Sequence, residues 1–165
     1  MTLSPIAKPT PFGSGVALLA ALMATASTVG ISALATLLSL VGVLLFALGL
    51  VLPHARLLTH GSIFLGAGVI VAGVSGSPPL AVGIGFIGTV IAWDVSHHSL
   101  SLGRQIGADN VSAAPEAVHA ATSFLLGGGA VGVGYLIFTA TSTGHSATAV
   151  ALLTLGVLFL IFTFR

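Results

Sequence analysis

The chain consists of long apolar runs separated by short polar breaks, a pattern that predicts membrane-spanning helices. Residues 12–52 carry no charge, and this run is roughly twice the ~20 residues that one helix needs to cross a bilayer. It must therefore turn once, at the small and polar residues 26–30. The alternation typical of a β-barrel is absent, and backbone groups in lipid must be satisfied internally, so we expect helices.

Four later breaks divide the rest of the chain. Pro53 ends the second apolar run, and Pro78-Pro79 removes two successive amide donors. Residues 103–114 form the longest polar stretch, and residues 141–146 form the last turn. The sequence predicts an all-α polytopic transmembrane helical bundle, a single domain over 1–165. Its six spans form three hairpins at about 12–27, 30–52, 57–74, 80–100, 115–139 and 147–164.

Composition agrees with this class. Hydrophobic residues make up 56% of the chain and charged residues 4%, which leaves too little polar surface to cover a water-soluble globule. We therefore expect the lipid bilayer of the cell membrane as surroundings. No basic patch exists, so no nucleic-acid partner is expected. The lack of Cys excludes disulfides and thiolate metal ligands.

The basic residues predict the orientation of the bundle. An even number of spans separates successive members of the set Lys8, Arg56, Arg104 and Arg165. The positive-inside rule then places all four, and both termini, in the cytoplasm. The start of the chain also resembles a secretory signal, with Lys8, an apolar run and the small residues 24–26. Cleavage there would leave five spans.

Two segments match the dinucleotide-binding pattern G-x-G-x-x-G, at residues 83–88 and 127–132. Phosphate binding needs a preceding strand and a free helix N-terminus, whereas both matches fall in the middle of predicted spans. We expect these glycines to allow close helix packing instead. The same glycine-rich faces could serve between copies of the chain as a homo-oligomer contact.

Residues 73–76, Gly-Val-Ser-Gly, look like the nucleophile motif of rhomboid intramembrane proteases, with His145 on the same predicted side. A serine must have a base within hydrogen-bond reach to be activated. Here Ser75 lies at a hairpin end and no other motif of that family accompanies it. We interpret the segment as a turn, predict no catalytic residue, and expect the protein not to be an enzyme.

Ionisable side chains gather near the inner ends of the third, fourth and fifth spans. Helical spacing puts Asp94 and His98 on one face of the fourth span and His97 on another. Glu116 and His119 are three residues apart and share a face of the fifth span. Ionisable groups at membrane depth are costly and suggest function. The candidate cluster comprises His60, Asp94, His97, His98, Arg104, Glu116 and His119.

Three interpretations of this cluster stay open. Asp94 and Glu116 could pair with Arg104 or a histidine and fasten the fourth and fifth spans together. Alternatively, His60, His98 and His119 could bind a metal or haem iron, although no specific ligand spacing is present and no cofactor is predicted. A proton or ion relay is the third, since histidine titrates near neutral pH. The predicted outer half offers few polar groups for such a relay.

The stretch from Trp93-Asp94 through residues 101–107, followed by Glu116 and residues 118–120, resembles the central signature of a family. That family consists of small multi-pass membrane proteins of unknown function from halophilic archaea. The resemblance implies membrane location and suggests that the family keeps the polar inner loop with its flanking acids and histidines, but it implies no activity. Residues 113–115, Ala-Ala-Pro, depart from the more polar and basic stretch expected there.

The sequence thus favours a non-enzymatic accessory or scaffold subunit, which docks a membrane or cytoplasmic protein partner through the cytoplasmic loop 103–114. A small transporter or channel is the alternative, and it would require a water-accessible cavity reaching the midplane. A metal- or haem-binding membrane protein is the second alternative.

Overall fold

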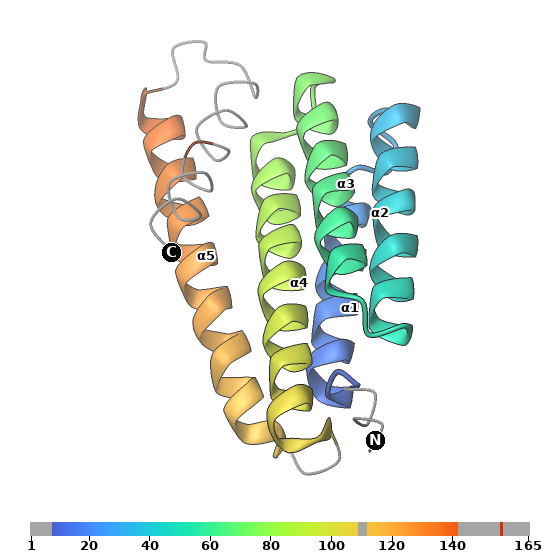
Figure 1. Ribbon diagram of the computed structural model, residues 1–165. Helices are drawn as coiled ribbons and strands as arrows, with labels where there is room; N and C mark the ends of the chain where they lie inside the picture. Colours follow the sequence, from blue (N-terminus) through green and yellow to red (C-terminus); the bar gives the residue numbers. More distant parts are fainter. Residues whose placement is uncertain (1–7, 109–111, 142–155, 157–165) are drawn as a thin grey trace.

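The computed structural model describes residues 8–108, 112–141 and 156. This part of the chain contains no strand and five α-helices: α1 (Pro11–Ala26), α2 (Ala33–Val51), α3 (Ala55–Val74), α4 (Pro79–Ile106) and α5 (Ala113–Thr141). The helices run up and down beside one another (Figure 1). Helix α4 packs against α1, α3 and α5, and α2 packs mainly against α3. The prediction of an all-α fold is confirmed.

Four of these helices are long and apolar enough to cross a membrane, namely α2, α3, α4 and the part Ala113–Leu136 of α5. Helix α1 is apolar but has 16 residues, so it rises about 24 Å, less than the ~30 Å hydrocarbon core. By length and composition, the four helices suggest a membrane protein. The sixth predicted span, 147–164, lies outside the described residues, and the orientation of the termini stays a prediction.

The helices end close to the predicted breaks, with one difference. Gly30 and Gly76 take the positive φ angles that the first and third turns require, 79° and 94°. Helix α4, however, continues past residue 100 to Ile106, so the segment predicted as a loop over 103–114 begins as helix. In this extension Gly103 packs on the backbone of Lys8, and the helix ends where Gly107 adopts a φ of 82°.

Helices α2 and α3 touch backbone to backbone. A Cβ atom on Gly42 would lie 2.8 Å from the Leu65 nitrogen, and one on Gly61 would lie 2.9 Å from the Gly42 oxygen. Gly49 and Gly68, each seven residues further along its helix, are equally crowded. No side chain fits at these positions, so dispersion between the two backbones holds the pair together. This contact was not predicted from the sequence.

The first G-x-G-x-x-G match, at residues 83–88 of α4, is buried in helix contacts. Gly83 faces Val131 of α5, and Gly85 faces Val69 of α3. Gly88 lies so close to α1 that an added Cβ would be 2.7 Å from the Ala20 oxygen. The prediction that these glycines allow close packing is therefore confirmed.

The second match, at residues 127–132 of α5, behaves differently. No described residue lies within 4 Å of a Cβ built on Gly127, Gly128, Gly129 or Gly132. Helix α5 contacts the bundle through Glu116, Ala120 and Val131. The predicted packing of these glycines is thus not made with the described part of the chain.

The α2–α3 contact predicts a sharp difference between two Gly→Ala substitutions. Gly61→Ala forces a methyl group against the α2 backbone and should lower the free energy of unfolding by about 1–3 kcal/mol. The matched control Gly127→Ala meets open space and should change it by less than about 1 kcal/mol. Unfolding in mixed micelles, followed by circular dichroism, measures both. Equal effects would contradict the contact.

The α4–α5 contact can be tested by a disulfide, because the chain has no Cys of its own. A Cβ on Gly83 would lie 3.8 Å from the Val131 Cβ, which matches disulfide geometry. The pair Gly83→Cys, Val131→Cys should therefore oxidise within one chain and lose both alkylation sites in mass spectrometry. The control pair Gly83→Cys, Gly129→Cys places the second thiol on the open side of α5 and should stay alkylated. Equal crosslinking of both pairs would be incompatible with this packing.

Candidate functional site

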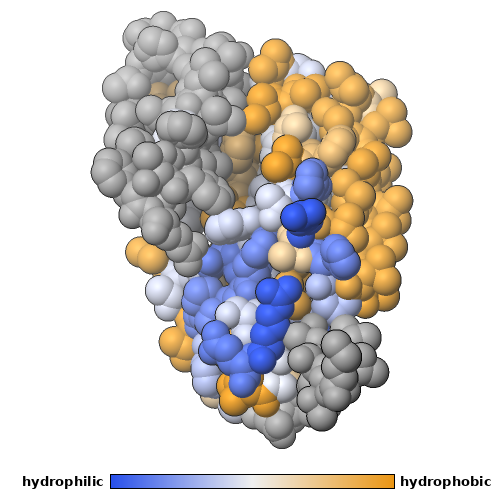
Figure 2. All heavy atoms as spheres, in the orientation of Figure 1, coloured by the Kyte–Doolittle hydropathy of each residue, from blue (hydrophilic) through white to orange (hydrophobic). Residues whose placement is uncertain are grey.

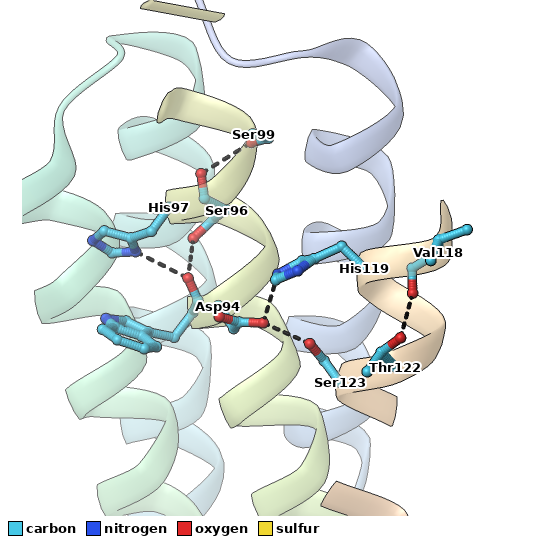
Figure 3. Close-up of polar contacts among 9 residues, drawn as sticks. Asp94, Ser96, His97, Ser99, Val118, His119, Thr122 and Ser123 are labelled. Carbon is cyan, nitrogen blue, oxygen red and sulfur yellow. Dashed lines mark hydrogen bonds and ion pairs between the residues drawn. The ribbon is translucent and has the colours of Figure 1, made fainter. Parts of the chain in front are cut away.

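Asp94 of α4 reaches across to α5 (Figure 3). Its Oδ2 atom lies 2.9 Å from His119 Nε2 and accepts a 2.6 Å hydrogen bond from the Ser123 hydroxyl. The Asp94 side chain is 15% exposed and that of His119 is 30% exposed, so surrounding groups partly shield the contact. The hydrogen bond from Ser123 to this carboxyl group is charge-assisted, and such bonds are stronger than neutral ones. Asp94 thus links α4 to two successive turns of α5.

His98 adds a second contact between the same helices. It follows Asp94 by one helical turn, and its ring stacks on His119 with the centroids 4.0 Å apart and the planes at 15°. His98 also lies within electrostatic range of Asp94 and Glu116. The contact between α4 and α5 therefore gathers two imidazoles and two carboxyl groups.

Glu116 is the most buried of the candidate residues. It lies in the first turn of α5, is 2% exposed, and accepts a hydrogen bond from the Thr10 hydroxyl just before α1. A Cβ on Gly13 would lie 2.5 Å from the Ser99 Cβ and 2.9 Å from Glu116 Oε1. The start of α1, α4 and the start of α5 thus meet around one carboxyl group, with no spare room.

His97 belongs to a different contact. Its Nδ1 atom lies 2.9 Å from the Trp93 carbonyl oxygen, and its Nε2 atom lies 3.3 Å from the Thr59 hydroxyl of α3. The Trp93 and His97 rings are 5.0 Å apart between centroids. The faces predicted from helical spacing are therefore those seen, with Asp94 and His98 toward α5 and His97 toward α3.

His60 and Arg104 are exposed and stay outside these contacts. The His60 ring contacts the Arg56 carbonyl oxygen of its own helix at 2.5 Å. Within the described ranges, no ion pair is formed by Arg104, which lies ten residues beyond Asp94, or about 15 Å along the helix. Of the partners predicted for the acids, the structure gives a histidine to Asp94. Glu116 bonds to Thr10 instead.

The positions of the described side chains give little support to the interpretation of the cluster as a metal site. Among residues 8–108, 112–141 and 156, no three His, Asp or Glu side chains are placed to hold one metal ion. The stacked rings of His98 and His119 lie face to face, and His60 is occupied on its own helix. For the protease motif, Ser75 is exposed at the end of α3, and His145 lies outside the described residues.

Several residues that contact the candidate site residues were not predicted from the sequence. Ser123 could have been found, since it follows His119 by four residues and Glu116 by seven, on one face of α5. Thr10 and Gly13 gave no signal, because they lie more than a hundred residues from Glu116 in sequence. Thr59 likewise meets His97 only in the folded chain.

The polar side chains on the surface of the bundle are concentrated at one of its ends. Polar side chains gather in the middle and lower part of the view, whereas the coloured surface above and to the right of them is mostly hydrophobic (Figure 2). The C-terminal half of α4 and the N-terminal half of α5 lie at that level (Figure 1). We call it the polar end; its exposed polar side chains include Lys8, Arg56, His60, Ser101, Arg104 and Gln105.

The fold and the site define an apolar α-helical bundle with one polar end. The chain belongs to a family of unknown function, DUF7519, whose profile matches residues 7–161. The expected membership of a family of unknown function is thus confirmed, while an origin in halophilic archaea stays a prediction. No curated protein and no solved structure matches the chain.

The Glu116 contact predicts different outcomes for two substitutions. Glu116→Ala leaves the Thr10 hydroxyl buried without its acceptor and should lower the free energy of unfolding by about 1–3 kcal/mol. Glu116→Gln keeps an acceptor oxygen and should retain most of that stability. Unfolding in mixed micelles compares the two variants with wild type. If Glu116→Ala matched wild type, the contact would carry no stability.

Proposed function

We propose that the protein is a multi-pass membrane protein with six spans and both termini in the cytoplasm. Four described helices have the required length and composition. The shorter apolar helix α1 would be a fifth span, and the apolar run 147–164 would be the sixth. The described cations Lys8, Arg56 and Arg104 lie at helix ends of the polar end. The positive-inside rule makes that end cytoplasmic.

Within this topology, we propose a non-enzymatic accessory or scaffold role. One observation supports the proposal: the acids and the cations of the polar end lie in different surroundings. The described acids Asp94 and Glu116 are used inside the bundle, by His119, Ser123 and Thr10. The cations remain exposed, and none of them forms an ion pair within the described ranges. The surface offered to a partner is therefore positive.

A partner that fits this surface is a protein segment rich in Asp and Glu. Charges at the rim of an interface mainly steer association and select partners by complementarity. Arg104 is suited to this role because its planar guanidinium can bind a carboxylate through two hydrogen bonds. It stands on the last turn of α4, just before the polar segment that follows Ile106.

The transporter or channel and the metal- or haem-binding protein remain predictions. A transporter or channel would need a water-filled path through the bundle, whereas the described core packs Ala, Leu, Val and Phe side chains. The metal or haem alternative has no supporting ligand geometry in the described residues. Self-association through the open glycine face of α5 likewise stays a prediction.

Co-purification from native membranes tests the docking role. The double variant Arg56→Ala, Arg104→Ala should lose at least about tenfold of a stoichiometric protein partner, as expected for two rim contacts of ~1 kcal/mol each or slightly more. The matched control Arg56→Lys, Arg104→Lys keeps the positive charge and should retain most of it. Quantitative mass spectrometry of the eluted complexes measures the difference. Binding should also weaken as salt rises.

Two outcomes would count against this role. One is the recovery of no stoichiometric partner from native membranes. The other is wild-type co-purification by a variant that combines Arg104→Ala with Glu116→Ala, since it would alter both an exposed cation and the buried carboxyl group of the polar end.

A further inference from the structure

Helix α5 lies at the edge of the bundle, and its side opposite Ala120 and Val131 is exposed along the helix (Figure 1). Of the described side chains of α5, only that of Glu116 is buried. The exposed positions on this side are three, four or seven residues apart, which is the spacing of one helix face. We call this face the outer stripe; it consists of Val118, Leu125, Gly129, Gly132 and Leu136.

We propose that the apolar segment 147–164 packs on the outer stripe and forms a helical hairpin with α5. This inference rests on the proposed six-span topology, in which that segment is the last span, but not on the docking role. Helix α5 ends at Thr141, and only residues 142–146 separate it from the segment. A link of this length joins helices that lie side by side and antiparallel. It also gives the segment a higher effective concentration at the outer stripe than a second copy of the chain has.

Glycines in two other helices show what such positions do in this protein. Each glycine of α2 and α4 contacts another part of the chain, with no room for a Cβ atom; they are Gly42, Gly49, Gly83, Gly85, Gly88 and Gly103. A glycine inside a helix costs ~1 kcal/mol relative to alanine, and close packing of a second backbone offsets that cost. Gly129 and Gly132 have no described residue within 4 Å of a built Cβ. A partner that uses them must therefore come from outside the described residues.

An exposed helix face with nothing packed on it has a different composition. The exposed side of α2 carries large side chains such as Leu37 and Leu44, whereas the glycines of α2 face α3. The outer stripe instead has its two glycines between the exposed side chains of Leu125 and Leu136. The backbone of α5 is thus uncovered between two large apolar side chains, which suits the close approach of another helix.

The segment 147–164 is long enough to cover the outer stripe. It is uncharged, and its 18 residues would rise about 27 Å as a helix. Gly129 precedes Thr141 by twelve residues, or about 18 Å along α5. An antiparallel partner that begins level with Thr141 therefore passes Gly129 with residues 157–160. Gly156 is exposed and has no described neighbour within 4 Å of a built Cβ, so other residues of the segment would make the contact.

Disulfide crosslinking of the full-length protein in membranes tests the proposal, since the chain has no Cys of its own. Gly129→Cys is combined in turn with a Cys at each of four positions that together cover one turn of a helix, namely Val157, Leu158, Phe159 and Leu160. At least one pair should oxidise within the chain. The matched control Ala130→Cys is exposed at the same height but points to another side of α5, so its crosslinking should be at least about tenfold weaker.

A second scan guards against a folding defect of the glycine variant. Leu136→Cys lies further along the outer stripe and leaves both glycines in place. It precedes Thr141 by five residues, so it should crosslink within the chain to a Cys at one of the positions 151–154.

The other possible occupants give different results. Disulfide-linked dimers of Gly129→Cys alone would show that a second copy binds the outer stripe. Absence of both dimers and crosslinks within the chain in the two scans would show that the stripe faces lipid. Either result would overturn the proposal.

The topology is tested separately by Arg165→Cys, which should react with a membrane-impermeant maleimide from the cytoplasmic side only. Reaction from the opposite side would contradict the six-span topology. Cytoplasmic reaction without any crosslink within the chain would contradict the packing alone.

Discussion

The structure depends on the close approach of helix backbones at small residues. At Gly42 and Gly61 the backbones of α2 and α3 meet with no room for a side chain, and at Gly88 α4 meets α1 in the same way. Within a membrane, lipid tails are as apolar as the side chains, so burial of apolar surface gives little drive for association. Dispersion between closely fitted backbones takes its place, and it sets how near α2 lies to α3 and α4 lies to α1.

This tight packing leaves the polar contacts of α4 and α5 in fixed positions. Asp94 holds His119 and Ser123, while Glu116 is enclosed by Thr10, Gly13 and Ser99. A polar contact in apolar surroundings is costly to break, because the freed groups find no water to replace their partners. The described acids therefore hold α5 against α4 and α1. The exposed cations make the outer surface of the polar end positive.

Local patterns in the sequence predicted much of this architecture. The apolar runs and the breaks at Gly30, Pro53 and Pro78 anticipate helix ends to within a few residues, with the extension of α4 to Ile106 as the main difference. Helical spacing likewise separated the face of Asp94 and His98 from that of His97. These features could be predicted because hydrophobic runs, turn residues and the helical period act over a few residues.

The amino-acid sequence by itself determined the all-α class, the approximate helix ends and the short list of ionisable residues. Only the tertiary structure decided which of those residues meet. Nothing local distinguishes Gly88, packed against α1, from Gly128, which faces no described residue. Nor does any local pattern pair Glu116 with Thr10, which precedes it by 106 residues, in place of Arg104. Which residues contact each other depends on how helices distant in sequence lie side by side. That arrangement is determined by the packing of the whole bundle.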